Sequence, residues 1–502
     1  MSYMKKYFKA LAWLSAGLLA VSSCDKGEYF SGWRYYASDE SYAPDVTAPE
    51  NPEGGKFDKI VENEFISAAE QPVSTFSVDA DGASYTWMRR CIADKMLPSA
   101  NSVRIEEFIN YFPFNYEDPS DGNTVALNAE TGTCPWAPGH LLIRLGMQGK
   151  RLRDSEIPTA NFVFLVDVSG SMDSEDKLDL LKSSLAAMVE TLRPQDRVSI
   201  VTYAGTVKKL LGSTPASESS KIISAIKKLS ASGSTAGGEA MKMAYEEALK
   251  NFIEGGNNRV IMGTDGDFNV GVTNTDALKE MVQDYAKKGI YLTVCGFGWG
   301  NLNDSMMETV SNAGNGTYEY IANSDDMVKV FIRERGKFRS VANDCKIQVS
   351  FNPETVAKYR LIGYENRKMS NDDFENDEKD AAEIGAGQSI TALYEIVPAE
   401  GAAGGSPAKF AFRYKKDLGS ESIPMELDVP AASETVSEDF WFAAAVASYG
   451  MILRGSEYRG NADLAKVVAW AEDGSKTFDP FGYRKNFIEI VGKALPLTQK
   501  LE

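Results

Sequence analysis

The spacing of hydrophobic residues changes along the chain and marks out one segment as an α/β fold. Between residues 161 and 335, short apolar runs alternate with stretches in which apolar residues recur every three or four positions. Alternating strands and amphipathic helices are typical of a mostly parallel sheet that is covered on both faces. We therefore predict an open, doubly wound α/β fold. The predicted strands are 162–166, 197–203, 259–262, 290–297 and 317–321, and the predicted helices are 177–192, 219–229, 238–251, 275–288, 304–313 and 325–335.

The regions on either side have the pattern of antiparallel strands. In residues 408–414 apolar and polar residues alternate, which indicates one buried and one solvated face. Because the two ends of a domain usually lie close together, we predict that the α/β segment is inserted into a single β-sandwich. The expected flanking strands are 74–79, 125–145 with a turn at 134–140, 346–351, 359–364, 389–397 and 409–414, and the expected flanking helices are 83–95, 440–450, 464–471 and 486–495.

The first 24 residues have the pattern of an export signal. Three lysines precede an apolar run over residues 10–21, which is too short to cross a bilayer. The run ends in Val-Ser-Ser-Cys24, which resembles the lipobox of bacterial lipoproteins. This resemblance implies a lipid anchor on Cys24 and a location in the bacterial cell envelope, with the membrane and face left open; the alternative is a simple cleaved signal peptide. The polar stretch that follows is expected to be a flexible tether.

These patterns predict six consecutive regions. The central one is the α/β domain, and the others are the signal, the tether and three flanking regions. We expect a lipoprotein signal peptide at 1–24, a tether at 25–71, an N-terminal flanking region at 72–160, the α/β domain at 161–335, a β-rich region at 336–430 and a helical region at 431–502.

Composition limits the chemistry that the chain can carry. The 502 residues have a net charge of −18, which disfavours binding to nucleic acid. The single histidine, His140, cannot form a multi-histidine zinc site, and its position in a Pro-Gly turn favours a structural role. A metal site in such a chain would use oxygen ligands, which suit Mg²⁺ or Ca²⁺. Four cysteines beyond residue 24 make disulfides possible, with the pairing open, and the strand pattern around Cys295 predicts a buried thiol.

Polar residues follow two of the predicted strands directly. Strand 162–166 leads into Asp167-Val-Ser169-Gly-Ser171, and strand 259–262 leads into Asp265. Between them, Gly233-Ser-Thr235 precedes a helix. Since ligands of open α/β sheets bind at the carboxyl ends of the strands, we expect these three loops to meet at one edge.

These motifs resemble the metal-ion-dependent adhesion site of the von Willebrand factor type A domain. The resemblance implies that Asp167, Ser169, Ser171, Thr235 and Asp265 surround one divalent cation and leave one coordination position open. Mg²⁺ is the first expectation, with Mn²⁺ and Ca²⁺ as alternatives. A carboxylate from a protein or peptide partner would then complete the coordination.

Two other acidic groups have alternative interpretations. Asp79, Asp81 and Ser84 are the expected caps of the helix at 83–95, with metal binding by the two aspartates as the second possibility. The stretch from Asp265 to Asp276 imitates a calcium-binding EF-hand loop, but Val270 stands where that loop requires glycine.

The flanking regions resemble those of a group of bacterial exported proteins that carry a type A domain. The resemblance rests on stretches such as 76–85, 103–112, 359–367 and 479–484, and it implies an architecture without an activity. The leading hypothesis is a non-enzymatic envelope protein that binds a partner through the cation. The alternative is an assembly or scaffold factor whose flanking domains make the main contacts. An enzyme ranks third, because no nucleophile–base pair can be named.

Overall fold

The computed structural model describes residues 55–79, 81–120, 122–153, 155–233, 237–266, 275–300, 302–402, 404–417 and 419–498. The predicted signal peptide, the lipidation site Cys24 and the predicted metal ligand Thr235 lie outside this part of the chain. No helix within the described ranges has both the length and the apolar character that a bilayer span needs.

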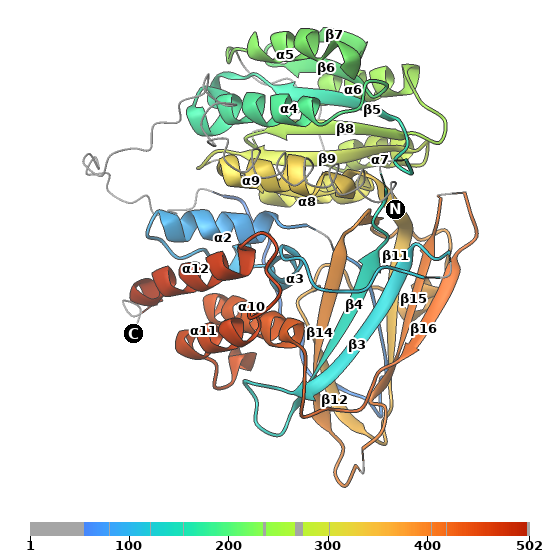
Figure 1. Ribbon diagram of the computed structural model, residues 1–502, viewed down its shortest axis with the longest axis vertical. Coiled ribbons are helices and arrows are strands. Elements are labelled where there is room, and N and C mark those ends of the chain that lie inside the picture. Colours follow the sequence, from blue (N-terminus) through green and yellow to red (C-terminus); the bar gives the residue numbers. More distant parts are fainter. Residues whose placement is uncertain are drawn as a thin grey trace, which may run out of the picture. The chain divides into compact units, whose positions relative to one another are not determined.

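The predicted α/β fold is confirmed. Its sheet has six strands in the order β10-β9-β8-β5-β6-β7, and every neighbouring pair is parallel except β6 and β7 (Figure 1). All eight residues of the central strand β5 are buried, because both faces of the sheet are covered. The strands are β5 (Ala160–Asp167), β6 (Arg197–Tyr203), β7 (Val207–Pro215), β8 (Asn257–Thr264), β9 (Ile290–Phe297) and β10 (Tyr318–Ile321).

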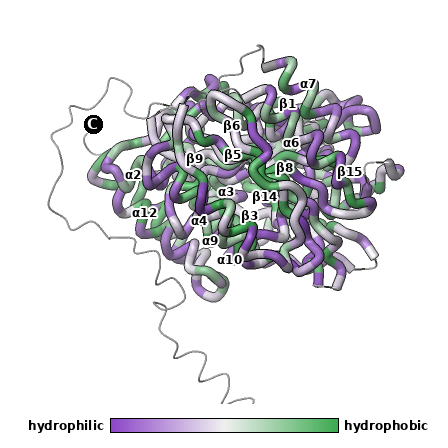
Figure 2. The backbone as a smooth tube through the Cα atoms, turned by 90° about the horizontal axis from the view of Figure 1, so that it is seen from above, coloured by the Kyte–Doolittle hydropathy of each residue, from purple (hydrophilic) through white to green (hydrophobic). Residues whose placement is uncertain are grey.

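Alternate residues of β5 serve two different cores. Val163 and Leu165 pack with α6, α7 and α8, whereas Phe162 and Phe164 pack with α4, α5 and α9. Figure 2 shows a strongly hydrophobic stretch at β8, the neighbour of β5 in the sheet. The helices are α4 (Leu180–Glu190), α5 (Ser219–Lys227), α6 (Gly237–Lys250), α7 (Thr275–Ala286), α8 (Asp304–Ala313) and α9 (Ser324–Val328).

The prediction that the α/β domain interrupts one β-sandwich is also confirmed. Strand β4 comes before the inserted domain in the chain and β14 comes after it, yet the two strands pair directly. Strand β12 pairs with the other edge of β14. In the second sheet β2 pairs with β11 across the same insertion. One apolar core joins both sheets. The strands are β1 (Ile66–Ser67), β2 (Val73–Ser77), β3 (Val125–Thr133), β4 (Leu141–Gly149), β11 (Ser340–Phe351), β12 (Val356–Ile362), β13 (Ile384–Gly385), β14 (Ser389–Pro398), β15 (Ala408–Lys415) and β16 (Ile423–Asp428).

Residues 55–71, predicted as part of a flexible tether, are instead ordered. Strand β1 pairs with β12, with Ile66 opposite Tyr359. The Asn63 side-chain amide donates hydrogen bonds to the carbonyl oxygens of Leu361 (3.1 Å) and Gly363 (2.8 Å). The prediction was wrong because backbone and amide hydrogen bonds, which need no apolar periodicity, hold this segment.

A helical core forms from the two ends of the described chain. Helices α2 (Ala83–Ala93) and α3 (Ile105–Asn110) pack with α10 (Glu438–Arg454), α11 (Leu464–Asp473) and α12 (Tyr483–Thr498) (Figure 1). The hydroxyl of Ser437 caps α10 by accepting a hydrogen bond from the Phe440 N–H, and Gly455, at φ +68°, ends it.

Candidate functional site

Two carboxylates lie side by side at the carboxyl edge of the central sheet. Strand β5 ends at Asp167, and Asp265 directly follows the neighbouring parallel strand β8. Both side chains are buried. This is the edge at which open α/β sheets bind ligands, as we expected from the motifs.

The first loop is organised by Asp167. One carboxylate oxygen accepts a hydrogen bond from the Ser169 N–H (2.9 Å), and the other accepts one from the Thr264 hydroxyl (3.2 Å). The hydroxyl oxygens of Ser169 and Ser171 are 3.0 Å apart. The structure therefore brings Asp167, Ser169, Ser171 and Asp265 together, and all of their donor atoms are oxygens.

The second loop is hydrogen-bonded to the first. The Gly170 N–H donates to the Gly233 carbonyl (3.0 Å), and the Ser232 N–H donates to the Val168 carbonyl (2.7 Å). Gly233 has φ +82°, a left-handed conformation that favours glycine. The second loop thus contacts the first loop at Gly233, two residues before Thr235 in the sequence.

Burial shapes the electrostatics of this site. It raises the pKa of Asp167 to about 6, and the nearby Asp265 adds to this rise, whereas hydrogen bonds from Ser169 and Thr264 oppose it. A cation beside the two carboxylates would stabilise their charged forms, against both the burial of Asp167 and its repulsion by Asp265. The donor set fits a hard divalent ion such as Mg²⁺.

One residue of the site was not predicted from the sequence. The Lys177 ammonium donates hydrogen bonds to the Asp265 carboxylate (3.0 Å) and to the Ser171 carbonyl (2.9 Å). It reaches them from the π-helical turn Glu175–Asp179 that precedes α4. It could have been predicted from its position, because Lys177 lies in the first helical turn after the Asp167–Ser171 motif.

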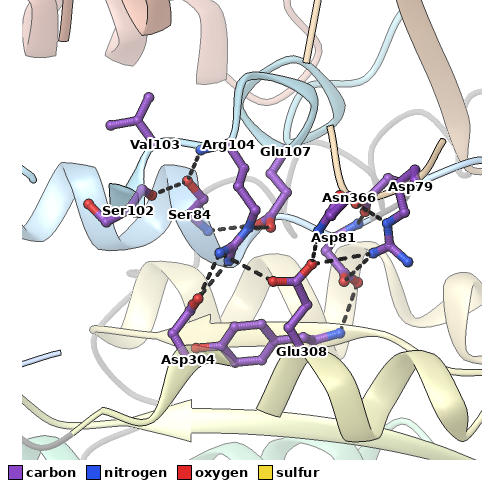
Figure 3. A network of polar contacts seen from close by, with 12 residues as sticks. Asp79, Asp81, Ser84, Ser102, Val103, Arg104, Glu107, Asp304, Glu308 and Asn366 are labelled. Carbon is purple, nitrogen blue, oxygen red and sulfur yellow. Dashed lines mark hydrogen bonds and ion pairs between the residues drawn. The ribbon is translucent and has the colours of Figure 1, made fainter. Parts of the chain in front are cut away.

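A second group of carboxylates lies away from this edge, where α8 meets the flanking regions (Figure 3). Oxygens of Asp79, Glu107 and Glu308 lie within 4.8 Å of one another. Arg104 forms ion pairs with Asp304 (2.7 Å) and Glu308 (3.3 Å) and also with Glu107.

Arg367 completes this group, and it corrects the predicted role of two aspartates. Arg367 pairs with Asp79 (2.8 Å) and lies 3.7 Å from Asp81, which also accepts a hydrogen bond from the Tyr318 N–H (2.8 Å). Helix α2 begins at Ala83, and the residue at its N-cap position is Gly82, which has no side chain to cap it, so the predicted capping role was wrong. Since two buried arginines compensate the carboxylates, we interpret the group as a polar core between regions.

The remaining candidates are structural or outside the described ranges. The His140 Nδ1 lies 2.6 Å from the buried Glu395, which also binds Arg360 (3.0 Å), in agreement with a structural role. The cysteines at 91, 134, 295 and 345 are all buried, as predicted for Cys295. Most of the EF-hand-like stretch, residues 267–274, is outside the described ranges.

Comparison with known proteins supports the domain type. A family model described as von Willebrand factor type A domain matches residues 161–333, and one described as von Willebrand factor matches 51–144. A third, the C-terminal region of the uncharacterized protein YfbK, matches 336–411 and 405–497. Domains of this type commonly mediate protein–protein interactions, and they often carry a divalent cation.

Two similar solved structures have low sequence identity to this chain. A von Willebrand factor type A protein from Catenulispora acidiphila is 13% identical, with 75% of this chain and 91% of that chain covered and a TM-score of 0.44. Proximal thread matrix protein 1 of the mussel byssus, with a zinc-occupied adhesion motif, is 21% identical, with 35% of this chain and 45% of that chain covered and a TM-score of 0.29.

A full-length relative is much closer. The uncharacterized protein YfbK of Escherichia coli K12 is 37% identical over 475 residues, which cover 89% of this chain and 82% of that protein. The chain therefore belongs to the YfbK family of bacterial proteins, with a von Willebrand factor type A domain between its flanking regions.

Proposed function

We propose that the protein binds one divalent cation at the carboxyl edge of its central sheet and uses it to hold a carboxylate of a protein partner. The observation that carries this proposal is the meeting of the buried Asp167 and Asp265 with the two hydroxyls of Ser169 and Ser171. Thr235 is the expected fifth ligand. Mg²⁺ is the first candidate, with Mn²⁺ and Ca²⁺ as alternatives.

Charge at the site explains why a carboxylate would be the last ligand. Two ionised aspartates balance a divalent cation, and the hydroxyls add no charge. Lys177, 3.0 Å from Asp265, then leaves the site with a local excess of positive charge. An anionic oxygen from a partner is therefore attracted locally, although the whole chain carries −18.

We further propose that this site is presented in the bacterial cell envelope by a lipid anchor on Cys24. The support is the basic start, the short apolar run and the Val-Ser-Ser-Cys ending. Mass spectrometry of the mature protein is expected to find an acylated Cys24 at its first position. A mature protein that begins elsewhere would contradict the anchor.

The metal site is tested by titrating the full chain with Mg²⁺ and Mn²⁺ in a calorimeter. We expect one binding event in the native protein and none in Asp265→Ala. Asp284→Ala, which removes a carboxylate whose side chain is 71% exposed on α7, should bind as the native protein does. Equal loss or equal binding in both variants would place the metal elsewhere.

The use of the metal is tested by capture of envelope proteins with and without EDTA. Metal-dependent binding predicts that EDTA and Asp167→Ala both abolish capture. A scaffold whose flanking domains make the main contacts would keep its partners in both conditions. Such a result would replace the adhesion hypothesis with the scaffold alternative.

A further inference from the structure

A cavity of about 770 Å³ lies at the opposite edge of the central sheet. Its walls come mainly from the first residues of β5 and β8 and from residues 110–114, 151–152, 157–158, 188–196, 333–339, 386–390 and 478–481. The volume is within the range of about 300–1,000 Å³ that is usual for small-molecule sites.

This cavity is separate from the candidate metal site. Strand β5 begins with Ala160 at the cavity and ends with Asp167 at the metal site. At a rise of about 3.3 Å per residue, the two ends are roughly 23 Å apart. A ligand here would be independent of the proposed cation.

The charge of the lining is opposite to that of the whole protein. Seven basic side chains line the cavity but only three acidic ones, in a chain with a net charge of −18. Four of the basic residues already have carboxylate partners. These are Arg151 with Asp118, Arg193 with Asp196, Lys329 with Glu334, and Lys337 with Glu319 and Glu334.

The other three are arginines from the short segment 333–339. In the described part of the chain, Arg333, Arg335 and Arg339 have no carboxylate within 4.0 Å. Arg333 donates a hydrogen bond to the Tyr483 hydroxyl (3.2 Å), Arg335 donates one to the Thr191 carbonyl (3.0 Å), and Arg339 donates one to the Gly256 carbonyl (3.4 Å). A guanidinium has five N–H donors, so each keeps donors for a ligand.

The rest of the lining is apolar and aromatic. Leu152, Leu192 and Phe478 contribute to the walls, and Phe481, 45% exposed, stands at the solvent side. The Arg333 guanidinium lies 5.2 Å from the centre of the Phe481 ring, which holds the ring beside the basic segment 333–339. The cavity therefore combines apolar walls with guanidinium groups that have no carboxylate partner among the described residues.

We propose that this cavity binds a small organic anion whose apolar, ring-sized body packs on Leu192 and Phe478 and whose carboxylate or phosphate head is held by Arg335 and Arg339. A planar guanidinium matches the oxygens of either head with paired hydrogen bonds. A neutral ligand of the same shape would leave the arginine charges uncompensated.

The surroundings of Arg339 compensate its charge only in part. Its partial burial lowers the pKa of the guanidinium, and the more distant Tyr291 and Asp417 only partly offset this. A bound anion would supply the compensating charge.

The test uses three probes with one ring system, 2-naphthoate, 2-naphthyl phosphate and the neutral 2-naphthamide, titrated into the full chain in a calorimeter. We expect at least one anionic probe to bind about tenfold or more tightly than the amide, since hydrogen bonds from a guanidinium to an anionic head group are stronger than those to a neutral amide. The tighter of the two anions identifies the head group.

Variants locate the binding. Arg335→Gln, at an exposed position, and Arg339→Gln should each weaken the anionic probe about tenfold and leave the amide unchanged. Phe481→Ser should weaken all probes. The matched control is Arg153→Gln, which removes the same charge from a side chain that is 80% exposed and outside the lining.

Three results would overturn the proposal. They are no binding of either anion, equal binding of anion and amide, and equal weakening by Arg335→Gln and Arg153→Gln. Addition of EDTA tests whether anion binding is independent of the metal site. We expect the anion to bind equally well after the divalent cation is removed. Loss of anion binding in EDTA would contradict a separate site.

Discussion

Lys177 controls the charge of the candidate metal site. Its ammonium lies 3.0 Å from the Asp265 carboxylate and would repel a divalent cation placed beside the same group. We predict that Lys177→Met binds Mg²⁺ about tenfold more tightly or better, because like charges about 4 Å apart repel by about 4 kcal/mol per unit-charge pair at an effective dielectric constant of 20. Calorimetric titration of native and variant protein measures the difference.

The control for this change is Lys182→Met. Lys182 lies on α4 and pairs with Asp179 instead of a candidate ligand, so its loss should leave Mg²⁺ affinity unchanged. Equal affinities in Lys177→Met and the native protein would show that the lysine side chain moves away from the ion without cost.

Glu106 makes stability depend on pH. Burial raises its pKa to about 7, Glu365 and Asp79 add to the rise, and Arg454 opposes it. Between its ordinary pKa near 4.5 and the folded value, the folded protein binds more protons than the unfolded chain, so stability falls as pH rises. We predict that Glu106→Gln raises the melting temperature at pH 8 by roughly 2–4 °C and has little effect at pH 4.5.

Thermal melts across this pH range test the assignment, with the exposed Glu246→Gln as the control. A gain from Glu106→Gln that is the same at pH 4.5 and pH 8 would mean that repacking, and not loss of the buried charge, causes it.

The loop after β2 is tied to other elements mainly through charge. Arg367, which follows β12, pairs with the buried Asp79 at 2.8 Å. Removing one partner leaves a buried, uncompensated charge, so we predict that Arg367→Gln lowers the free energy of unfolding by about 3–5 kcal/mol. Urea denaturation measures this change.

Two further variants show whether the loss comes from the buried charge. Asp79→Asn added to Arg367→Gln should restore part of the stability, since it removes the unpaired carboxylate. Arg413→Gln breaks a more exposed pair with Asp377 and should cost about 1 kcal/mol or less. If the double variant is no more stable than Arg367→Gln, packing and not charge explains the loss.

The elements that could be predicted are those with a strong apolar pattern. Strands β6 and β9 have the predicted bounds, and the continuous apolar run of β5 indicated a strand with both faces covered. The edge strands β7 and β16 were missed, because their exposed positions interrupt that pattern. Local pattern thus predicts buried elements better than edges.

In the candidate sites too, local motifs could be predicted but contacts between distant residues could not. That Asp167, Ser169, Ser171 and Asp265 lie together could be predicted, because their short motifs stand at the carboxyl ends of two predicted strands. The pairing of Arg104 with Asp304 could not, because these residues are 200 positions apart and no local pattern connects them. The cavity was missed for the same reason, since its walls come from segments throughout the chain.

The two halves of the sandwich depend on each other across the inserted domain. A chain that ends at Gly336 would keep β3, β4 and the α/β domain but lose β11 to β16. We predict that backbone amides of β4 lose their protection from hydrogen exchange in this truncated chain, while those of β5 stay protected. Exchange followed by mass spectrometry measures both, and protected β4 amides would contradict the mutual dependence.

The same insertion determines the order in which the protein can form during synthesis. Strand β4 is made early, but its neighbour β14 comes much later, as shown by the hydrogen bond between Gln148 and Gln388, 240 residues apart. At about 5–20 residues per second, the ribosome needs roughly 10–50 s to supply that neighbour. For this time one edge of the β3–β4 hairpin is open to other chains, whereas the α/β domain forms from contiguous sequence. The speed of translation across residues 150–390 therefore determines how long the nascent chain keeps an open strand edge at which it can aggregate.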